Sequence, residues 1–595
     1  MSYRPQTESL THVLNDIAGF SGLVEDGVFA DLPSDLVEQI LEEAGRFAGE
    51  VLAPINRVGD ETGATRNPDG SVTTAPGWKE AYAQWVEAGW GGLPCPVEYG
   101  GQGLPVSLGL AVQELWNTAA SAFGIGTLLT QGAAEALNAF GSDTLKARYL
   151  PKLATGEWTG TMVLTEPQAG SDLGLIKTRA EPAGDGTYRI RGTKIFITYG
   201  EHDLTDNIVH FVLARLPDAP AGTKGISMFL VPKVLVNEDG SLGERNDVQC
   251  AGLEHKLGIH GSPTCTMAFG EAEGAVGWLV GEENRGLHHM FMMMNNARLH
   301  VGMQGVAVAE RATQQALAYA RERRQGKRPG GDGLAVIVEH PDVRRMLMDM
   351  RVRTEAARAI CFVTARALDL STHGRDEGER RSNAALCALL TPVAKAFGTD
   401  TGVEVASTGI QVHGGMGFIE ETGAAQHYRD ARITPIYEGT NGIQAIDLVT
   451  RKVTMEGGET VRAHIASLKE IAREVAASNT PGFGETAARL DMALDVLEEA
   501  TEWLLGALGD DADLALAGAV PYLKLFGLAS GGAYLARGAL GAKGSGSGDA
   551  RIRIARYFAE RHLPETLSLS QVVRDGADVL VETGADSPAM VADGA

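Results

Sequence analysis

Hydrophobic residues recur at helical spacing in the first part of the chain. Residues 33–35 (Pro-Ser-Asp) carry a typical helix-start signal, and apolar residues follow on one face over residues 36–47. Pro54 predicts the end of this helix. A turn is expected at residues 67–70 (Asn-Pro-Asp-Gly), and helical patterning then continues to about residue 158.

The pattern changes to that of β-strands after residue 158. Short runs rich in β-branched and aromatic residues are bounded by Gly, Pro and Asp. Strands are expected at residues 188–198, 208–216 and 225–231.

Helical spacing returns from residue 284 and continues almost to the end of the chain. Helices of a bundle are predicted at residues 286–324, 342–370 and 381–406. Further helices are predicted at residues 459–477, 485–508, 513–540 and 549–563, with a Gly/Ser-rich loop at 541–548. The prediction is an α+β protein of four domains: an N-terminal helical domain (1–158), a β-barrel-like middle domain (159–282), a helical bundle (283–456) and an extra C-terminal helical domain (457–595).

Composition excludes several classes of protein. A net charge of −24 disfavours sequence-independent binding of nucleic acid. Five cysteines without CxxC spacing indicate neither a disulfide framework nor a zinc site, and the histidines show no metal-site spacing. No secretory signal opens the chain, and no apolar run is long enough to span a membrane. We therefore expect a cytoplasmic protein without a metal.

Two segments carry candidate chemistry. In the first, residues 436–444 (Ile-Tyr-Glu-Gly-Thr-Asn-Gly-Ile-Gln), Glu438 stands between an aromatic residue and a glycine, just before a helix expected to start near Thr440 or Asn441. A carboxylate held against apolar neighbours gains basicity and is suited to remove a proton from carbon. The alternative is that Glu438 only caps the helix that follows.

The second segment, residues 162–172 (Met-Val-Leu-Thr-Glu-Pro-Gln-Ala-Gly-Ser-Asp), lies where the chain leaves the first helical region for the strands. Its small and hydroxyl residues allow the backbone to approach a planar ring and offer donors to the ring's heteroatoms. Taken alone, it also fits an ordinary loop.

Together the two segments resemble the acyl-CoA dehydrogenase family over roughly residues 35–456. The resemblance implies an enzyme that binds FAD, with Glu438 as the base that takes the α-proton of an acyl-CoA while a hydride leaves the β-carbon for the flavin. It also implies that the backbone N–H of Glu438 helps to stabilise the enolate oxygen. The flavin-binding residues it implies are Leu164, Thr165, Gly170, Ser171, Phe196, Thr198, Arg323, Gln411, Gly414, Gly415 and Thr440. Those implied for the substrate are Ser171, Arg298, Glu438 and Gly439.

The chain departs from the family pattern at Phe196 and at residues 321–326 (Arg-Glu-Arg-Arg-Gln-Gly), where the segment is one residue shorter and Gln325 stands where the family usually has Phe. Phe196 stands where the family usually has Trp, which keeps an aromatic face but loses the indole N–H. Some members place the base directly before the arginine that matches Arg298, but here that residue is Ala297, which leaves Glu438 as the candidate. For Arg298 a surface ion pair is the alternative, and for Arg323 a helix-end contact.

The resemblance implies formation of a trans-2-enoyl-CoA with electrons passed to an electron-transfer flavoprotein. The C-terminal extension makes the chain similar to a long bacterial subgroup that includes 3-methylmercaptopropionyl-CoA dehydrogenases and broad-range fatty acyl-CoA dehydrogenases, and a homodimer is expected. Two alternatives stay open: an acyl-CoA oxidase that uses oxygen, and a DNA-binding damage-response relative, which the acidic charge disfavours. Acyl length, branching and thioether preference do not follow from these motifs.

Overall fold

The computed structural model describes residues 3–583 except 31, 329, 332 and 576, and the chain divides into two compact units. Of the described residues, the sheet unit contains 3–5 and 42–300, and the helical unit contains 6–41 and 301–583, apart from the gaps just named. Helix α8 (Gly286–Glu322) belongs to the sheet unit up to residue 300 and to the helical unit after it. The boundaries of the four predicted domains stay a prediction.

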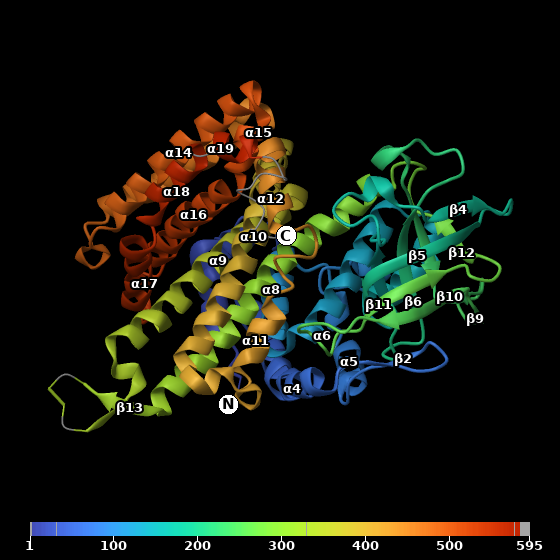
Figure 1. The fold of residues 1–595 in the computed structure, drawn as a ribbon, viewed down its shortest axis with the longest axis horizontal. Helices are drawn as coiled ribbons and strands as arrows, with labels where there is room; N and C mark the ends of the chain where they lie inside the picture. Colours follow the sequence, from blue (N-terminus) through green and yellow to red (C-terminus); the bar gives the residue numbers. More distant parts are fainter. Residues whose placement is uncertain (1–2, 31, 329, 332, 576, 584–595) are drawn as a thin grey trace, which may run out of the picture. The chain divides into compact units, whose positions relative to one another are not determined.

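An eight-stranded sheet forms the centre of the sheet unit (Figure 1). Its strand order is β10-β11-β5-β12-β7-β6-β3, with β4 beside β5, and only β3 and β6 pair in parallel. The predicted strand at residues 188–198 is confirmed as β5, and those near 208 and 227 as β6 and β7. The strands are β3 (Thr159–Val163), β4 (Arg179–Pro182), β5 (Tyr188–Thr198), β6 (Ile208–Ala214), β7 (Ser227–Pro232), β10 (Val248–Leu253), β11 (Thr264–Phe269) and β12 (Ala275–Leu279).

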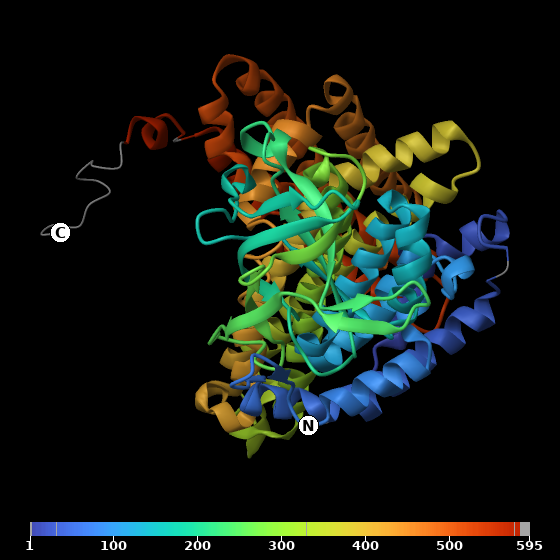
Figure 2. The same ribbon diagram turned by 90° about the vertical axis from the view of Figure 1, so that its right-hand side faces the viewer.

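Helix α6 (Val106–Phe140) packs against β3 (Figure 2) and contributes to the apolar core of this unit. Leu137 of α6, Phe211 of β6 and Met290 of α8 belong to one buried cluster. Met290 and Met293, of the methionine-rich run at residues 290–294, are buried in this cluster. The remaining elements of this unit are α4 (Ala53–Thr62), α5 (Trp78–Glu87), α7 (Asp143–Thr155) and the pairs β1 (Thr65–Arg66) with β2 (Val72–Thr73) and β8 (Val234–Val236) with β9 (Leu242–Arg245).

The helix near residue 34 does not end at Pro54, so that prediction is wrong. Helix α3 (Ser34–Phe47) passes through a π-helical turn at Ala48–Leu52 into α4, and Pro54 lies in the first turn of α4. A proline is tolerated there because it directly follows the π-helical turn, where the regular i to i−4 hydrogen-bond pattern is already interrupted. Two short helices before residue 33, α1 (Thr7–His12) and α2 (Phe20–Glu25), were not predicted.

The helical unit is built on the second part of α8 and on α9 (Pro341–His373) and α10 (Glu377–His413), close to the predicted bundle helices. Glycines allow α8 and α10 to approach closely, since a Cβ added at Gly305 would lie 2.3 Å from the carbonyl oxygen of Gly398. Shorter elements complete this part: the β13–β14 hairpin (Arg324–Lys327, Leu334–Val336), α11 (Ala424–Ala431) and α12 (Asn441–Asp447).

The C-terminal extension packs around α16 (Ala519–Gly541), which is buried along most of its length and contacts α9. The predicted helix at 513–540 is split at Gly518 into α15 (Ala512–Ala517) and α16, because the backbone there lies against the Val573 carbonyl; a Cβ at Gly518 would lie 2.5 Å from that oxygen. The other helices are α13 (Glu459–Ala477), α14 (Thr486–Asp510), α17 (Gly548–Arg561), α18 (Glu565–Arg574) and α19 (Ala577–Glu582).

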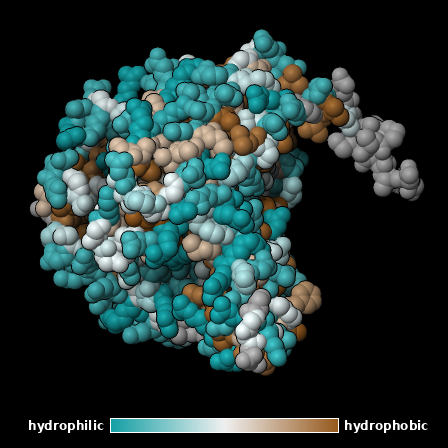
Figure 3. Space-filling model, turned by 90° about the vertical axis from the view of Figure 1, so that its left-hand side faces the viewer, coloured by the Kyte–Doolittle hydropathy of each residue, from teal (hydrophilic) through white to brown (hydrophobic). Residues whose placement is uncertain are grey.

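Hydrophilic side chains predominate on the molecular face in Figure 3, as a net charge of −24 leads one to expect. Within the described ranges, none of the helices has the length and apolar character needed to cross a bilayer.

Candidate active site

Glu438 lies in the helical unit, in the connection between α11 and α12. Its backbone is left-handed, with φ +55°, and Gly439 follows at φ +85°. For a residue other than glycine this conformation costs about 1 kcal/mol or more, and such residues concentrate at functional sites. The fold therefore holds a half-buried carboxylate in a strained turn.

The helix after Glu438 has a different cap. The Thr440 hydroxyl accepts a hydrogen bond from the Ile443 N–H at 3.3 Å, and α12 starts at Asn441 as predicted. Glu438 stands two residues before this cap, so capping of α12 does not account for it.

Polar side chains fix the backbone on both sides of Glu438. The Gln444 amide donates to the carbonyl oxygens of Glu438 (3.3 Å) and Gly439 (3.2 Å). The side-chain oxygen Oδ1 of Asn441 accepts a hydrogen bond from Lys395 Nζ at 2.8 Å. The side-chain amide nitrogen Nδ2 of Asn441 donates to Asp400 Oδ1 at 2.7 Å. Because Lys395 and Gln444 are fully buried, the turn is tied rigidly to α10.

Tyr437 provides a further tie from the residue next to Glu438. Its hydroxyl donates to Gln304 Oε1 of α8 at 2.5 Å. Burial raises the pKa of Tyr437 well above its ordinary value, so the phenol stays protonated and keeps this bond.

The second candidate segment lies in the sheet unit directly after β3. The Ile195 N–H of β5 donates to the Thr165 carbonyl oxygen at 2.9 Å, which fastens the segment to that strand. Leu164 and Thr165 are partly exposed, and Gly170 and Ser171 are exposed.

A buried ion pair supports this segment from beneath. Lys194 Nζ lies 2.9 Å from Glu166 Oε1, and both side chains are at most 4% exposed. Burial alone would raise the pKa of Glu166, but Lys194 and hydrogen bonds from the Thr178 hydroxyl and the Lys177 N–H outweigh it and lower that pKa to about 2. Burial lowers the pKa of Lys194 to about 8, so both groups are charged at neutral pH.

Phe196 lies on β5, two residues beyond Lys194, with φ +60° and a side chain that is 59% exposed. Thr198, at the end of the strand, is partly exposed. Phe196 and Leu164 thus offer apolar surface, and Thr165, Ser171 and Thr198 offer hydroxyl groups. This composition fits a planar heteroaromatic ring such as a flavin, which has an apolar face and polar edges.

Lys194→Met is expected to lower the free energy of unfolding by about 3–5 kcal/mol, because it leaves Glu166 buried without its charged partner. The segment at 164–171 should then hold flavin less firmly, as seen in a lower ratio of bound flavin to protein. The matched control is Lys177→Met, whose side chain is exposed and whose N–H still binds Glu166. Equal stability and flavin content in the two variants would contradict the supporting role of the pair.

The remaining predicted residues fall in two other places. Arg323, Gln411, Gly414 and Gly415 are all exposed and lie at the same end of the helical unit, where Tyr319 of α8 stacks on His413 of α10. Residues 414–417 directly follow helix α10 and not a strand. This glycine-rich segment is therefore not the turn that binds dinucleotides, which follows a strand.

Arg298 lies in the part of α8 that belongs to the sheet unit. Only 6% of it is exposed, so it is a buried rather than a surface residue, and its guanidinium donates to Asn295 Oδ1 at 3.5 Å.

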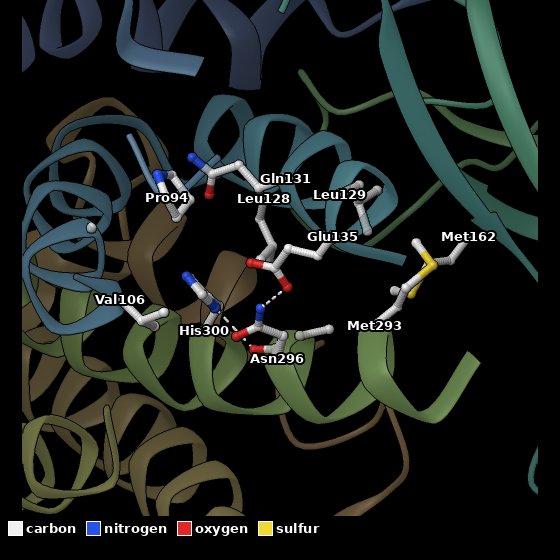
Figure 4. A pocket seen from close by; sticks show the side chains of 13 residues that line it. Pro94, Val106, Leu128, Leu129, Gln131, Glu135, Met162, Met293, Asn296 and His300 are labelled. Atoms are coloured by element: carbon white, nitrogen blue, oxygen red, sulfur yellow. Dashed lines mark hydrogen bonds between the residues drawn. The ribbon is translucent and has the colours of Figure 1, made fainter. Parts of the chain in front are cut away.

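A narrow pocket lies entirely within the sheet unit (Figure 4). It is lined by Leu128, Leu129 and Gly132 of α6, by Met162 of β3, and by Met293 and Ala297 of α8. Met162 precedes Leu164 by two residues, so the pocket begins beside the candidate flavin segment. Its apolar walls are suited to an aliphatic chain.

Several residues of these sites were not predicted. Lys395 and Asn441 fix the turn of Glu438, and Lys194 and Glu166 support the loop after β3. The sequence offered one usable signal for Lys194: a lysine in the middle of a strand that is otherwise apolar or aromatic at neighbouring buried positions.

Four family models match consecutive parts of the chain. "Acyl-CoA dehydrogenase, N-terminal domain" matches residues 34–157, the middle domain 161–272 and the C-terminal domain 284–453. "Acetyl-CoA dehydrogenase C-terminal like" matches residues 463–583.

Known proteins are similar over nearly the whole chain. The "3-methylmercaptopropionyl-CoA dehydrogenase" of Ruegeria pomeroyi is 46% identical over 98% of this chain and 99% of its own. The "Broad-specificity linear acyl-CoA dehydrogenase FadE5" of Mycobacterium tuberculosis is 32% identical over 96% of this chain and 97% of its own. An acyl-CoA dehydrogenase of Bacillus anthracis, solved in complex with FAD, shares the fold, with a TM-score of 0.74, 23% identity and coverage of 93% and 90%.

Proposed function

Because the chain belongs to the acyl-CoA dehydrogenase family, we propose that it oxidises a short acyl-CoA thioester to the trans-2-enoyl-CoA with Glu438 as the base. As a member of this family the enzyme binds FAD. We propose that the electrons pass on to an electron-transfer flavoprotein.

The strained turn of Glu438 is the observation that supports this assignment most strongly. The left-handed backbone at Glu438 and Gly439 is held by Gln444, and Thr440 caps the helix. The backbone that carries the carboxylate is thus fixed, and the side chain that caps α12 is that of Thr440. A positioned general base of this kind contributes about 10²–10⁴-fold to a rate.

The chain's residues have separate tasks in the reaction. Glu438 takes the α-proton, and its backbone N–H stabilises the charge that develops on the thioester oxygen. The isoalloxazine ring would be held by Leu164, Thr165, Gly170, Ser171, Phe196 and Thr198. Thr440 would also contact the cofactor. The substrate would be contacted by Ser171, Arg298 and Gly439. Bound FAD supplies the acceptor for the hydride that leaves the β-carbon.

We assign Arg323, Gln411, Gly414 and Gly415 to the FAD of a partner subunit in a homodimer. All four are exposed at one end of the helical unit, so they are accessible to a cofactor held by another chain. An arginine is well suited to bind a pyrophosphate.

The proposed substrate is 3-methylmercaptopropionyl-CoA or a short fatty acyl-CoA. A relative 46% identical over its full length is named for the former, and a more distant one for linear acyl-CoA.

A panel of thioesters tests the function directly. We expect an artificial electron acceptor to be reduced with butyryl-CoA, pentanoyl-CoA and 3-methylmercaptopropionyl-CoA, with the enoyl-CoA as product. The last two differ in one position, where sulfur replaces a methylene, and their ratio measures the thioether preference. Peroxide formed stoichiometrically without acceptor would show an oxidase instead, and no turnover of any thioester would refute the proposal.

A further inference from the structure

Two arginines of the helical unit lie near each other. Arg366 belongs to α9 and Arg537 to α16, two helices in contact, and their positive charges are close enough to act on one another. Both side chains are half-buried. Among the residues that the structure describes, neither guanidinium has a hydrogen bond or an ion pair, and the Nε atom of each is buried.

The surroundings leave the N–H groups of both arginines open to a further acceptor. The Arg537 guanidinium lies over the Tyr534 ring, 4.9 Å from its centroid. All N–H groups of an arginine lie in the guanidinium plane, so contact with the face of a ring leaves them free to donate elsewhere. Arg366 Nε lies beside the backbone at Gly19, where a Cβ would be 3.9 Å away. Because residue 19 has no side chain, space remains next to this atom.

Carboxylates in the neighbourhood do not supply this acceptor. Those that act on the charges of the two arginines are Glu379, Asp369 and Asp26 for Arg366, and Glu474 for Arg537. Glu379 and Asp26 instead contact Arg375, at 3.1 and 3.5 Å. In the part of the chain that the structure describes, none of the four carboxylates is in ion-pair contact with Arg366 or Arg537.

Burial disfavours the charged form of both side chains. It lowers the pKa of Arg366 and of Arg537, and the charge of Arg366 lowers the pKa of Arg537 further. If the arginines only covered apolar surface with their stems, their guanidinium groups would extend into water. A water molecule could accept a hydrogen bond from them, but it is neutral and does not offset two like charges. An anion does both.

We propose that Arg366 and Arg537 together bind one phosphate group, which joins α16 of the C-terminal extension to α9 of the bundle. A phosphate group carries negative charge and several acceptor oxygens, and an arginine can bind it through two parallel hydrogen bonds. Inorganic phosphate and a phosphate ester share this chemistry. No residue of the Glu438 turn takes part, so the inference stands apart from the proposed function.

Titration of the FAD-loaded protein with inorganic phosphate tests the inference. Binding is followed by calorimetry and by the thermal unfolding midpoint, at an ionic strength held constant with sodium chloride. A ligand that binds only the folded protein raises this midpoint, and we expect a rise of about 1–3 °C.

Arg366→Gln and Arg537→Gln should each weaken phosphate binding about tenfold or more, because each removes a charge-assisted hydrogen-bond donor. The control is Arg473→Gln, at an exposed position on α13, which should bind phosphate like the unaltered protein. Should a glutamine variant not fold, Arg366→Lys keeps the charge but loses the planar fork, and it should also bind phosphate more weakly.

A purely structural role of the arginines predicts a different result. The glutamine variants would then lose the same number of degrees in midpoint with and without phosphate, which would overturn the inference. Phosphate binding by Arg366→Gln and Arg537→Gln, or by Arg366→Lys, at the affinity of the unaltered protein would also overturn it. Adenosine monophosphate distinguishes the two sources of the phosphate group: a midpoint rise that Arg366→Gln abolishes extends the site to esters, and no rise assigns it to free phosphate.

Discussion

Glu438→Gln should retain FAD and lose turnover by about 10²–10⁴-fold, the range expected for loss of a positioned general base. Glutamine keeps the size of the side chain but cannot accept the α-proton. The turn should persist, because the backbone is held by Gln444 and by the contacts of Asn441 rather than by the carboxylate. Steady-state kcat with an artificial acceptor and the flavin absorbance of the purified protein provide the two readouts.

The control for this variant is Glu377→Gln, at an exposed position in the first turn of α10. It should show unaltered kcat and FAD content. Turnover by Glu438→Gln at the rate of this control would remove Glu438 from the mechanism. Loss of FAD together with activity would instead assign Glu438 a role in cofactor binding.

Much of the fold was predictable because long elements carry strong periodic signals. Strand β5 and helix α13 have the predicted bounds, and the prediction of an α+β fold with an extra C-terminal helical region is confirmed. The helix ends were predicted wrongly where one residue type can have different effects in different surroundings. Proline usually ends a helix, but Pro54 lies in the first turn of α4. Gly518 separates α15 from α16 at a point where the backbone lies against the Val573 carbonyl oxygen.

The sequence indicated the two motif segments of the candidate site, but not the residues that hold these segments in place. Each segment taken alone also fits an ordinary cap or loop, and the two are recognised only because together they match the motifs of one family. Lys395 and Gln304 act through partners that lie 46 and 133 residues away in the sequence. Pairings of this kind arise only when helices pack together, so no local pattern reveals them.

A buried ion network in the helical unit joins the C-terminal extension to the bundle. Glu355 of α9 contacts Arg351 (2.5 Å), Arg358 (3.0 Å) and Arg551 of α17 (3.4 Å). Glu310 of α8 lies 2.8 Å from Arg358. Three arginines thus share two carboxylates, and Glu355 and Arg358 are at most 1% exposed.

Glu355→Gln should therefore lower the free energy of unfolding by about 3–5 kcal/mol, because it leaves three arginines, two of them largely buried, with Glu310 as the one remaining carboxylate of this network. Burial alone would raise the pKa of Glu355, but the three arginines hold that pKa well below its ordinary value of 4.5. A lowered pKa stabilises the fold fully above pH 4.5 and progressively less as the pH falls below it. Denaturant midpoints at pH 7 and below pH 4.5 should show that the variant loses less stability on acidification than the unaltered protein.

Glu470→Gln provides the matched comparison, because Glu470 and Arg473 also form an i, i+3 pair on one helix, at 2.8 Å. Both of their side chains are more than half exposed, so water screens the pair and its loss should cost less than about 1 kcal/mol. The difference between the two variants measures what burial adds to the same pair of charges. Equal midpoints would mean that the network does not hold the extension to the bundle, and that the apolar contacts of α16 do so alone.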